Sequence, residues 1–272
     1  MSRTFFASEL EGVATYWRIY RTDGCTLGFV SHDRDLVADD ILHRAAPGIL
    51  PASLRKTDTL GGDSAEMRGP LGHWSISDAD LEQGRFDHAT VEVGALDWET
   101  GEALALFSGT LGAVSRDGGT FVAELQSAKA MLDVDPVPRT SPSCRARFCG
   151  EGCTLSAARF THQARITQVD AEKGMVRTDI AAPQRFVHGE LRWLSGAAAG
   201  LKTQIRSIDD GWIRLPGTIR ADRLETGMPV TLREGCDHRI TTCSGRFGNA
   251  VNFQGEPFLP GNDHLSRYAV PG

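Results

Sequence analysis

Five of the six cysteines lie in two groups that could bind a metal centre. Cys144, Cys149 and Cys153 form the first group, and Cys236 and Cys243 form the second. Cysteine thiolates are the usual ligands of structural zinc and of iron–sulfur clusters. Zinc sites usually pair cysteines with about two to four residues between them, whereas the outer cysteines here are nine and seven positions apart. An iron–sulfur cluster is larger than one ion, so this spacing favours a cluster, with zinc and with unligated or disulfide-bonded cysteines as the alternatives.

Cys149 and Cys25 stand outside the pairing of the outer cysteines. Only three residues separate Cys149 from Cys153, which is near the zinc-type spacing, so Cys149 is a possible substitute for Cys144 as the fourth ligand. Cys25 falls in a predicted strand over residues 25–31. Its simplest interpretation is a small buried hydrophobic side chain.

Nucleophilic catalysis is a different interpretation of the same residue types. Cys243 with His238 or His264 could form a thiol–imidazole pair, and the chain would then be a cell-wall-degrading cysteine hydrolase. However, no cysteine stands at the start of a predicted helix with a distant histidine on a strand, and spacing alone does not establish such a pair. We therefore expect no catalytic residue and keep the hydrolase as the alternative function.

The elements between the two cysteine groups predict how the thiols would meet. Short β runs separated by glycines fill residues 164–233 and indicate a small β-barrel, because no helices alternate with them. The expected strands are 164–169, 175–178, 190–194, 201–208, 212–215 and 229–232. Such barrels commonly return their two ends to one side. The flanking segments, residues 135–163 and 234–272, should therefore lie together. The second contains too much Gly and Pro for a regular helix or strand, so we expect irregular structure there.

Residues 1–134 predict a separate antiparallel β domain. Asp23 and Gly24 lie between two apolar runs, which is a strong hairpin signal. Ser77 is placed to cap a brief helix, and Pro136 with the prolines after it marks the domain boundary. The expected strands are 15–21, 25–31, 71–76, 86–98, 103–114 and 120–125. A long loop with at most one strand near Leu54 is expected over 44–64, and a helix over 127–134. The whole chain is thus predicted to be mainly β.

Composition excludes several classes of function. The formal net charge of −6 gives no basic excess for binding a nucleic-acid backbone. No apolar run approaches the roughly 18 residues that a membrane helix needs, and the N-terminus has no signal-peptide core of sufficient length. We therefore expect no membrane segment and synthesis in the cytoplasm, where clustered cysteines more often bind metal than form disulfides.

Motifs at both ends of the chain resemble a known family. In the C-terminal segment these are Gly235-Cys236-Asp237, Thr242-Cys243, Phe247, Asn249, Asn252-Phe253, Gly255, Pro257 and Pro260-Gly261. In the opening they are Trp17, Arg18, Asp23-Gly24, Gly28-Phe29 and His32-Asp33-Arg34-Asp35-Leu36. Together they resemble the tail-tip, or baseplate, hub proteins of long-tailed phages and phage-derived gene transfer agents, a family related to the minor tail protein L of phage lambda.

The resemblance implies a function, a fold and a cofactor. It implies a homotrimeric structural protein at the tail tip of a virion or virion-like particle, assembled in the bacterial cytoplasm. Its partners would be a distal tail protein and a central tail-tip or fibre protein, and DNA would pass through the ring without specific binding. The N-terminal domain would be tail-tube-like. The related protein carries its cluster on four cysteines, so the resemblance implies a [4Fe-4S] cluster on Cys144, Cys153, Cys236 and Cys243.

Overall fold

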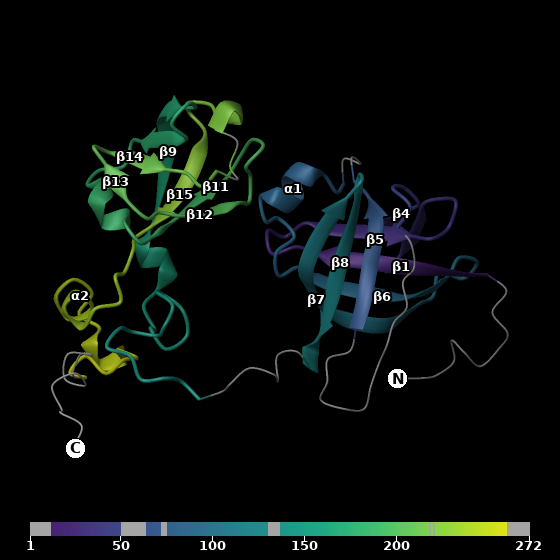
Figure 1. The fold of residues 1–272 in the computed structure, drawn as a ribbon, viewed down its shortest axis with the longest axis horizontal. Coiled ribbons are helices and arrows are strands. Elements are labelled where there is room, and N and C mark those ends of the chain that lie inside the picture. The colour runs from purple at the N-terminus through teal and green to yellow at the C-terminus, as the bar shows by residue number, and fades with distance from the viewer. Residues whose placement is uncertain are drawn as a thin grey trace, which may run out of the picture. The chain divides into compact units, whose positions relative to one another are not determined.

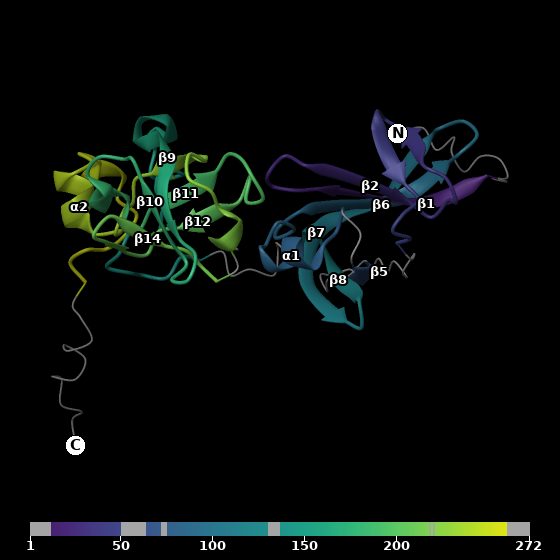
Figure 2. The same cartoon turned by 90° about the horizontal axis from the view of Figure 1, so that it is seen from above.

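The chain divides into two compact units, residues 1–136 and 137–272, in a computed structural model. The structure describes residues 12–49, 64–71, 75–129, 137–217, 219 and 221–259. Figures 1 and 2 show that each unit is built around its own curved β-sheet. The predicted mainly β class is confirmed.

The first unit contains an eight-stranded sheet with the order β3-β4-β2-β1-β6-β7-β8-β5. Its strands are β1 (Val13–Tyr20), β2 (Thr26–Val30), β3 (Leu36–Ala38), β4 (Ile41–Arg44), β5 (Ser64–Pro70), β6 (Thr90–Asp97), β7 (Ala103–Asp117) and β8 (Thr120–Ser127). One face covers a core that includes Trp17, Phe29 and Phe121. The pairing is antiparallel except between β2 and β4, which run parallel, so the prediction of a purely antiparallel domain is wrong at this pair.

The predicted hairpin at Asp23 and Gly24 joins β1 to β2. Gly24 has a φ of +93°, which glycine adopts without steric cost, and Asp23 Oδ1 accepts a hydrogen bond from the Cys25 amide at 3.1 Å. The turn thus includes Cys25, and β2 begins only at Thr26. Cys25 is exposed. The prediction that it is buried within a strand is therefore wrong.

The segment before the first helix also differs from the prediction. Residues 72–74 of the strand expected over 71–76 lie outside the described residues, and the strand in this part of the chain is β5 (Ser64–Pro70), which ends before Leu71. Within the described residues β5 pairs with β8 alone and forms one edge of the sheet, where a proline is tolerated because one side of the strand needs no hydrogen-bond donor. The helix prediction is confirmed: Ser77 Oγ accepts the Asp80 amide at 3.1 Å and caps α1 (Asp78–Glu82). Most of the helix predicted over 127–134 lies outside the described residues, and Ser127 ends β8.

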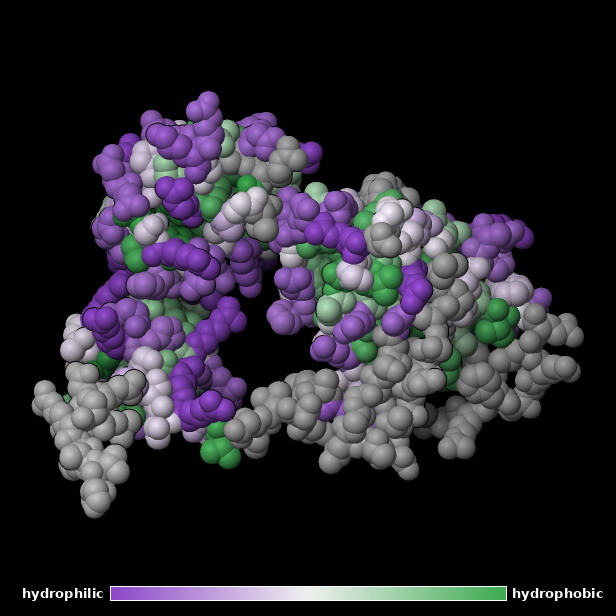
Figure 3. Space-filling view, viewed as in Figure 1, coloured by the Kyte–Doolittle hydropathy of each residue, from purple (hydrophilic) through white to green (hydrophobic). Residues whose placement is uncertain are grey.

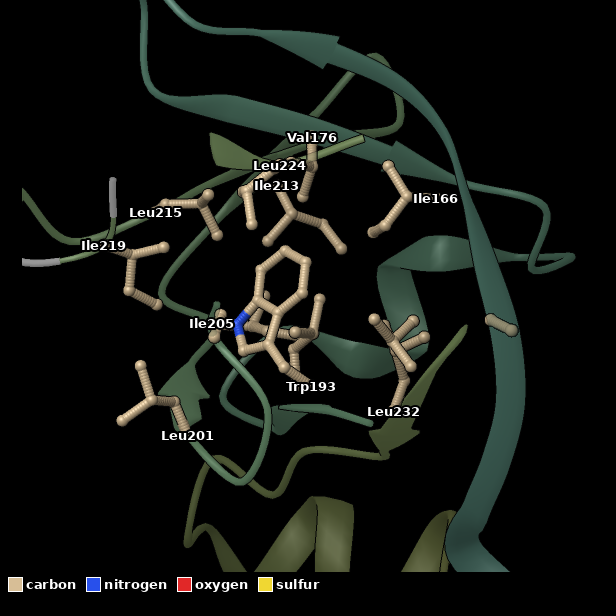
Figure 4. Packing of buried hydrophobic residues seen from close by; sticks show 14 of the residues in the cluster. Ile166, Val176, Trp193, Leu201, Ile205, Ile213, Leu215, Ile219, Leu224 and Leu232 are labelled. Atoms are coloured by element: carbon tan, nitrogen blue, oxygen red, sulfur yellow. The ribbon is translucent and has the colours of Figure 1, made fainter. Parts of the chain in front are cut away.

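The second unit contains a curled seven-stranded sheet, order β12-β11-β15-β9-β10-β14-β13. Its strands are β9 (Thr161–Asp170), β10 (Met175–Thr178), β11 (Glu190–Trp193), β12 (Lys202–Gln204), β13 (Ile208–Asp209), β14 (Trp212–Arg214) and β15 (Pro229–Arg233). The expected strand 201–208 is divided into β12 and the start of β13. Trp193 is fully buried at the centre of the core, among Ile205, Ile213 and Leu232 (Figure 4). Within the described residues the strand pairs leave β12 and β13 as the two ends of the sheet, which is a half-barrel rather than a closed ring.

The C-terminal segment is more regular than predicted. It contains a helix, α2 (Ile240–Gly245), and a 3-10 turn, η6 (Ala250–Asn252). The expectation of wholly irregular structure is wrong for these residues, because the Asp237 carboxylate organises the helix start by accepting hydrogen bonds from the Arg239 amide and from Thr242 Oγ1.

Hydrophilic side chains cover most of the visible face of the second unit (Figure 3). In the described part of the chain, no helix is both long and apolar enough to span a bilayer.

Candidate metal centre

Backbone hydrogen bonds join the two cysteine-bearing segments on either side of the half-barrel. The amide of Cys144 donates to His238 O at 2.8 Å, and the amide of Arg145 donates to Gln254 O at 2.9 Å. The amide of Glu256 donates to Ser141 O at 2.8 Å. In Figure 1 the teal and yellow segments accordingly lie side by side next to α2. The two ends of the half-barrel therefore return to one place.

Side chains reinforce this junction. Both guanidinium nitrogens of Arg145 bind the Glu256 carboxylate, at 2.8 and 2.9 Å. The hydrogen bond from Arg145, with a second from the Ser141 amide, lowers the pKa of Glu256 to about 2. Gly255 packs so closely that an added Cβ would lie 2.6 Å from Ser143 O. Glycine is required at this crossing of the two segments.

The junction brings four cysteines to the wall of one small cavity. Cys144 and Cys153 come from the first segment, and Cys236 and Cys243 come from the second. The cavity has about 320 Å³ of space not occupied by atoms, part of it open to solvent. Its other lining residues are Ala146, Phe148, Leu155, His238, Phe247, Asn249, Asn252 and Phe253. All four thiols named by the resemblance thus share one site, and their role as ligands stays a prediction.

The thiols surround the cavity without converging on a point. Among the described residues, no three Cys, His, Asp or Glu side chains are arranged to hold a metal ion. A single zinc ion needs its sulfur ligands at about 2.3 Å, so this geometry gives no support to a mononuclear site. Four thiolates around an iron–sulfur cluster are spread more widely, because the cluster lies between them. The wall offers four thiols and no carboxylate, and the Nδ1 of His238, which also lines it, is 2.9 Å from the Cys144 carbonyl oxygen, so the four thiols are the donors that fit that group.

Three N–H groups point at the cysteine sulfurs. The amide of His238 lies 3.4 Å from Cys236 Sγ, and the amide of Gln254 lies 3.4 Å from Cys144 Sγ. The side-chain Nδ2 of Asn249 lies 3.8 Å from Cys153 Sγ. Donors of this kind stabilise negative charge on thiolate sulfur and change the reduction potential of an iron–sulfur cluster that the thiolates bind. Three of the four thiols therefore already have a donor for their anionic form.

Aromatic rings form the apolar part of the site. Phe148, Phe160 and Phe247 contact one another pairwise, with ring centroids 4.8 to 5.5 Å apart. Each comes from a different part of the unit: the first cysteine segment, the turn before β9, and the residues after α2. This small core holds the junction against the half-barrel.

The same apolar surroundings disfavour thiolates while the cavity holds no cation. Burial raises the pKa of Cys243, and the nearby sulfurs of Cys144 and Cys153 raise it further. Burial also raises the pKa of Cys236 and outweighs the hydrogen bond from the His238 amide. A bound cationic centre would offset this cost and favour the thiolate forms around the cavity.

Cys149 is placed differently from the other four cysteines. It does not line the cavity, and its backbone has a φ of +57°. Burial raises the pKa of Cys149 to about 11, and the charges of Cys153 and Cys236 contribute to the shift. Its thiol is therefore near the site but outside the cavity wall, which favours Cys144 as the fourth ligand.

Comparison with known proteins identifies the family. The family described as "Baseplate hub protein, N-terminal attachment domain" matches residues 3–156, more than half of the chain. The chain belongs to the baseplate hub proteins. A second family, described as "Phage conserved hypothetical protein BR0599", matches residues 184–263. No curated protein matches the sequence.

A solved structure resembles the hub protein over nearly its whole length. The matching chain comes from the "Virion of native gene transfer agent (GTA) particle", with 32% sequence identity and a TM-score of 0.80. The match covers 97% of the hub protein and 94% of the other chain. The predicted resemblance is confirmed, and the hub protein is a component of the tail tip of a virion or virion-like particle.

A buried carboxylate anchors the cysteine site of the hub protein to its half-barrel. The Glu234 side chain is 4% exposed and lies within 2.7 Å of Arg185 and 2.6 Å of Arg246, with His162 at 3.1 Å. Burial alone would raise the pKa of Glu234, but hydrogen bonds from Arg246 and His162, with the charge of Arg185, outweigh it and lower the pKa. Arg246 follows α2 directly and also donates to the Arg185 and Gly235 carbonyls.

Neither this cluster nor the contacts of Asn249 are predictable from the local sequence. Glu234 directly precedes the Gly-Cys pair, and charged residues at a strand end are usually solvated, so its position carried no signal. The partners lie about 10 to 70 positions away, and only the fold of the half-barrel brings them together. Asn249 was noticed only as part of the family motif.

Proposed function

We propose that the protein is the structural hub of a tail tip, joining the tail tube to the distal penetration or receptor-binding apparatus. The similarity to one chain of a gene transfer agent virion, which covers 97% of this protein, carries the proposal. The family name assigns an attachment role to the N-terminal part, and that part is the eight-stranded sheet of the first unit. A broad, twisted sheet offers edges and faces to neighbouring subunits.

The proposed assembly is a homotrimeric ring. In a ring of identical subunits each copy presents two different complementary faces. The distal tail protein and the central tail-tip or fibre protein would contact the ring from opposite ends. DNA would pass through without specific binding, and a net charge of −6 is compatible with a surface that does not retain phosphate.

The proposed cofactor is a structural [4Fe-4S] cluster on Cys144, Cys153, Cys236 and Cys243. The shared cavity, its four thiols and the N–H groups facing three of the sulfurs support it. When bound, the cluster would link the two segments covalently through iron–sulfur bonds. The chain's own residues close the same junction by backbone hydrogen bonds and by the Arg145–Glu256 pair.

The environment of Cys243 argues against the alternative, a cell-wall-degrading cysteine hydrolase. An activated cysteine nucleophile has a lowered pKa and an accessible sulfur, whereas Cys243 is buried and its pKa is raised. The His238 Nδ1 lies 2.9 Å from the Cys144 carbonyl oxygen rather than against a thiol. His264 lies outside the described residues. A structural protein without catalytic residues accounts better for these features.

Electron microscopy of purified particles tests the whole proposal. We expect three copies of this chain in a ring at the tail tip, with strong density in the four-cysteine cavity. Density for this chain elsewhere in the particle, or a different copy number, would contradict the hub assignment. A cavity without extra density in anaerobically prepared particles would contradict the cofactor alone.

A further inference from the structure

One buried residue, Asn249, contacts cysteines of both segments. Its backbone N–H donates to Cys243 O at 3.0 Å, within the second segment. Its side-chain Nδ2 donates to Cys153 O at 2.6 Å and faces Cys153 Sγ at 3.8 Å, within the first segment. Asn249 is 7% exposed and lines the cavity. A single residue thus sets the separation of two cysteines that are 90 positions apart in sequence.

A neighbouring side chain fixes the orientation of this amide. Asn252 Nδ2 donates to Asn249 Oδ1 at 2.8 Å. Because Oδ1 is occupied as an acceptor, Nδ2 must be the atom that faces Cys153. Asn249 directly precedes the η6 turn and Asn252 ends it, and the backbone N–H of Asn252 also donates to Asn249 O at 3.0 Å. The donor is therefore aimed at the thiol before any ligand binds.

We infer that Asn249 is the positioning residue of the four-cysteine site, which sets the Cys153–Cys243 separation and tunes the bound centre through its Nδ2–H group. The inference rests on the proposed iron–sulfur cluster. Only an amide side chain of this length supplies a donor to Cys153 and an acceptor for Asn252 at once. An N–H donor to a ligand sulfur stabilises the more negative, reduced state of a cluster and so raises its reduction potential.

Two variants separate tuning from simple packing. Asn249→Asp keeps the size and the acceptor for Asn252, but replaces the donor by a carboxylate. Asn252→Ala keeps Asn249 and frees its orientation. Ser244→Ala is the matched control, because Ser244 is exposed on α2 next to Cys243 and its side chain makes no hydrogen bond among the described residues.

The experiment measures the reduction potential and the rate of iron release to a chelator in the anaerobically purified full-length protein. We expect a lower potential and about tenfold faster release for Asn249→Asp, since a lost hydrogen bond of about 1.4 kcal/mol corresponds to a factor of ten. Asn252→Ala should shift both quantities in the same direction by less, and Ser244→Ala should match the unmodified protein.

The possible outcomes distinguish the two proposals. If the unmodified protein holds no cluster, the proposed cofactor fails and this inference fails with it. If the unmodified protein holds a cluster and both asparagine variants match Ser244→Ala, the inference fails while the cofactor stands. If Asn249→Asp takes up no cluster at all, Asn252→Ala becomes the test. A lower reduction potential in Asn252→Ala supports the inference, and a potential equal to that of Ser244→Ala contradicts it.

Discussion

Replacing Glu234 by Gln should destabilise the second unit, because Glu234 joins the cysteine site to the half-barrel. The carboxylate is 4% exposed and binds two guanidinium groups and an imidazole. Gln keeps the volume but removes the charge. Breaking a fully buried ion pair costs about 3–5 kcal/mol, but Arg185 and Arg246 are partly exposed and can be solvated after the change. We therefore expect a loss of about 2–3 kcal/mol, lower than that range because exposed pairs contribute little.

Differential scanning calorimetry of the full chain measures this loss. A unit of this size shifts its Tm by about 3–4 °C for each kcal/mol, so the transition of the second unit should fall by about 6–12 °C. Glu190→Gln is the control: among the ion pairs of the described residues Glu190 has one partner, the exposed Arg147 at 3.8 Å, so the change should alter stability by less than about 1 kcal/mol. Variants should be compared at equal iron content.

The pH dependence of stability gives an independent check. The pKa of Glu234 is lowered in the folded state, so its contribution is fully present above the unfolded pKa of about 4.3 and is lost as the pH falls through the folded pKa. In Glu234→Gln this part of the acid destabilisation should be absent. The prediction is contradicted if Glu234→Gln and Glu190→Gln have the same Tm at neutral pH and lose the same stability as the pH is lowered.

Three further changes test other parts of the structure. Gly255→Ala should destabilise the junction, because the added Cβ would lie 2.6 Å from a backbone oxygen. Gly245→Ala in α2 is the control, because its Cβ meets no atom within 4 Å. Thermal unfolding compares the two variants, and equal Tm values would contradict the close approach at Gly255. Arg18→Met should lower the stability of the first unit by about 3 kcal/mol in denaturant titrations, since it leaves the buried His43 without its hydrogen-bond donor and the Glu92 carboxylate without its cation. An effect below about 1 kcal/mol would show that these contacts contribute little. Cys25→Ser should leave stability and iron content unchanged because Cys25 is exposed in a turn, and loss of either would place Cys25 in a structural role.

The sequence predicted the elements with strong local signals. The Asp23-Gly24 hairpin and the Ser77 cap each depend on a few neighbouring residues, and both were predicted correctly. The strands of the second unit have short apolar runs between glycines, and most were found within a residue or two. Strands β3, β4 and β5 were missed. β3 and β4 have only three and four residues, which is too short for an alternating pattern, and β5 ends in Gly69 and Pro70, which weaken a strand pattern.

The candidate site shows a different limit. The meeting of the two cysteine segments followed from the return of the barrel ends, but the choice of Cys144 over Cys149 came from a family resemblance rather than from spacing. Cys149 has a left-handed backbone conformation and lies outside the cavity wall, and the local sequence does not predict either feature. The ion pairs of Glu234 and the bridge through Asn249 depend on tertiary contacts, which a local pattern does not encode.

Iron and acid-labile sulfide analysis of anaerobically purified protein tests the four-cysteine centre most directly. The full-length protein, Cys25→Ser and Cys149→Ser should each contain about four iron and about four sulfide per chain, as a [4Fe-4S] cluster requires. Ser at Cys144, Cys153, Cys236 or Cys243 should remove most of both. Colourless protein with stoichiometric zinc, or full iron content in a Cys243→Ser variant, would contradict a cluster held by these four thiols.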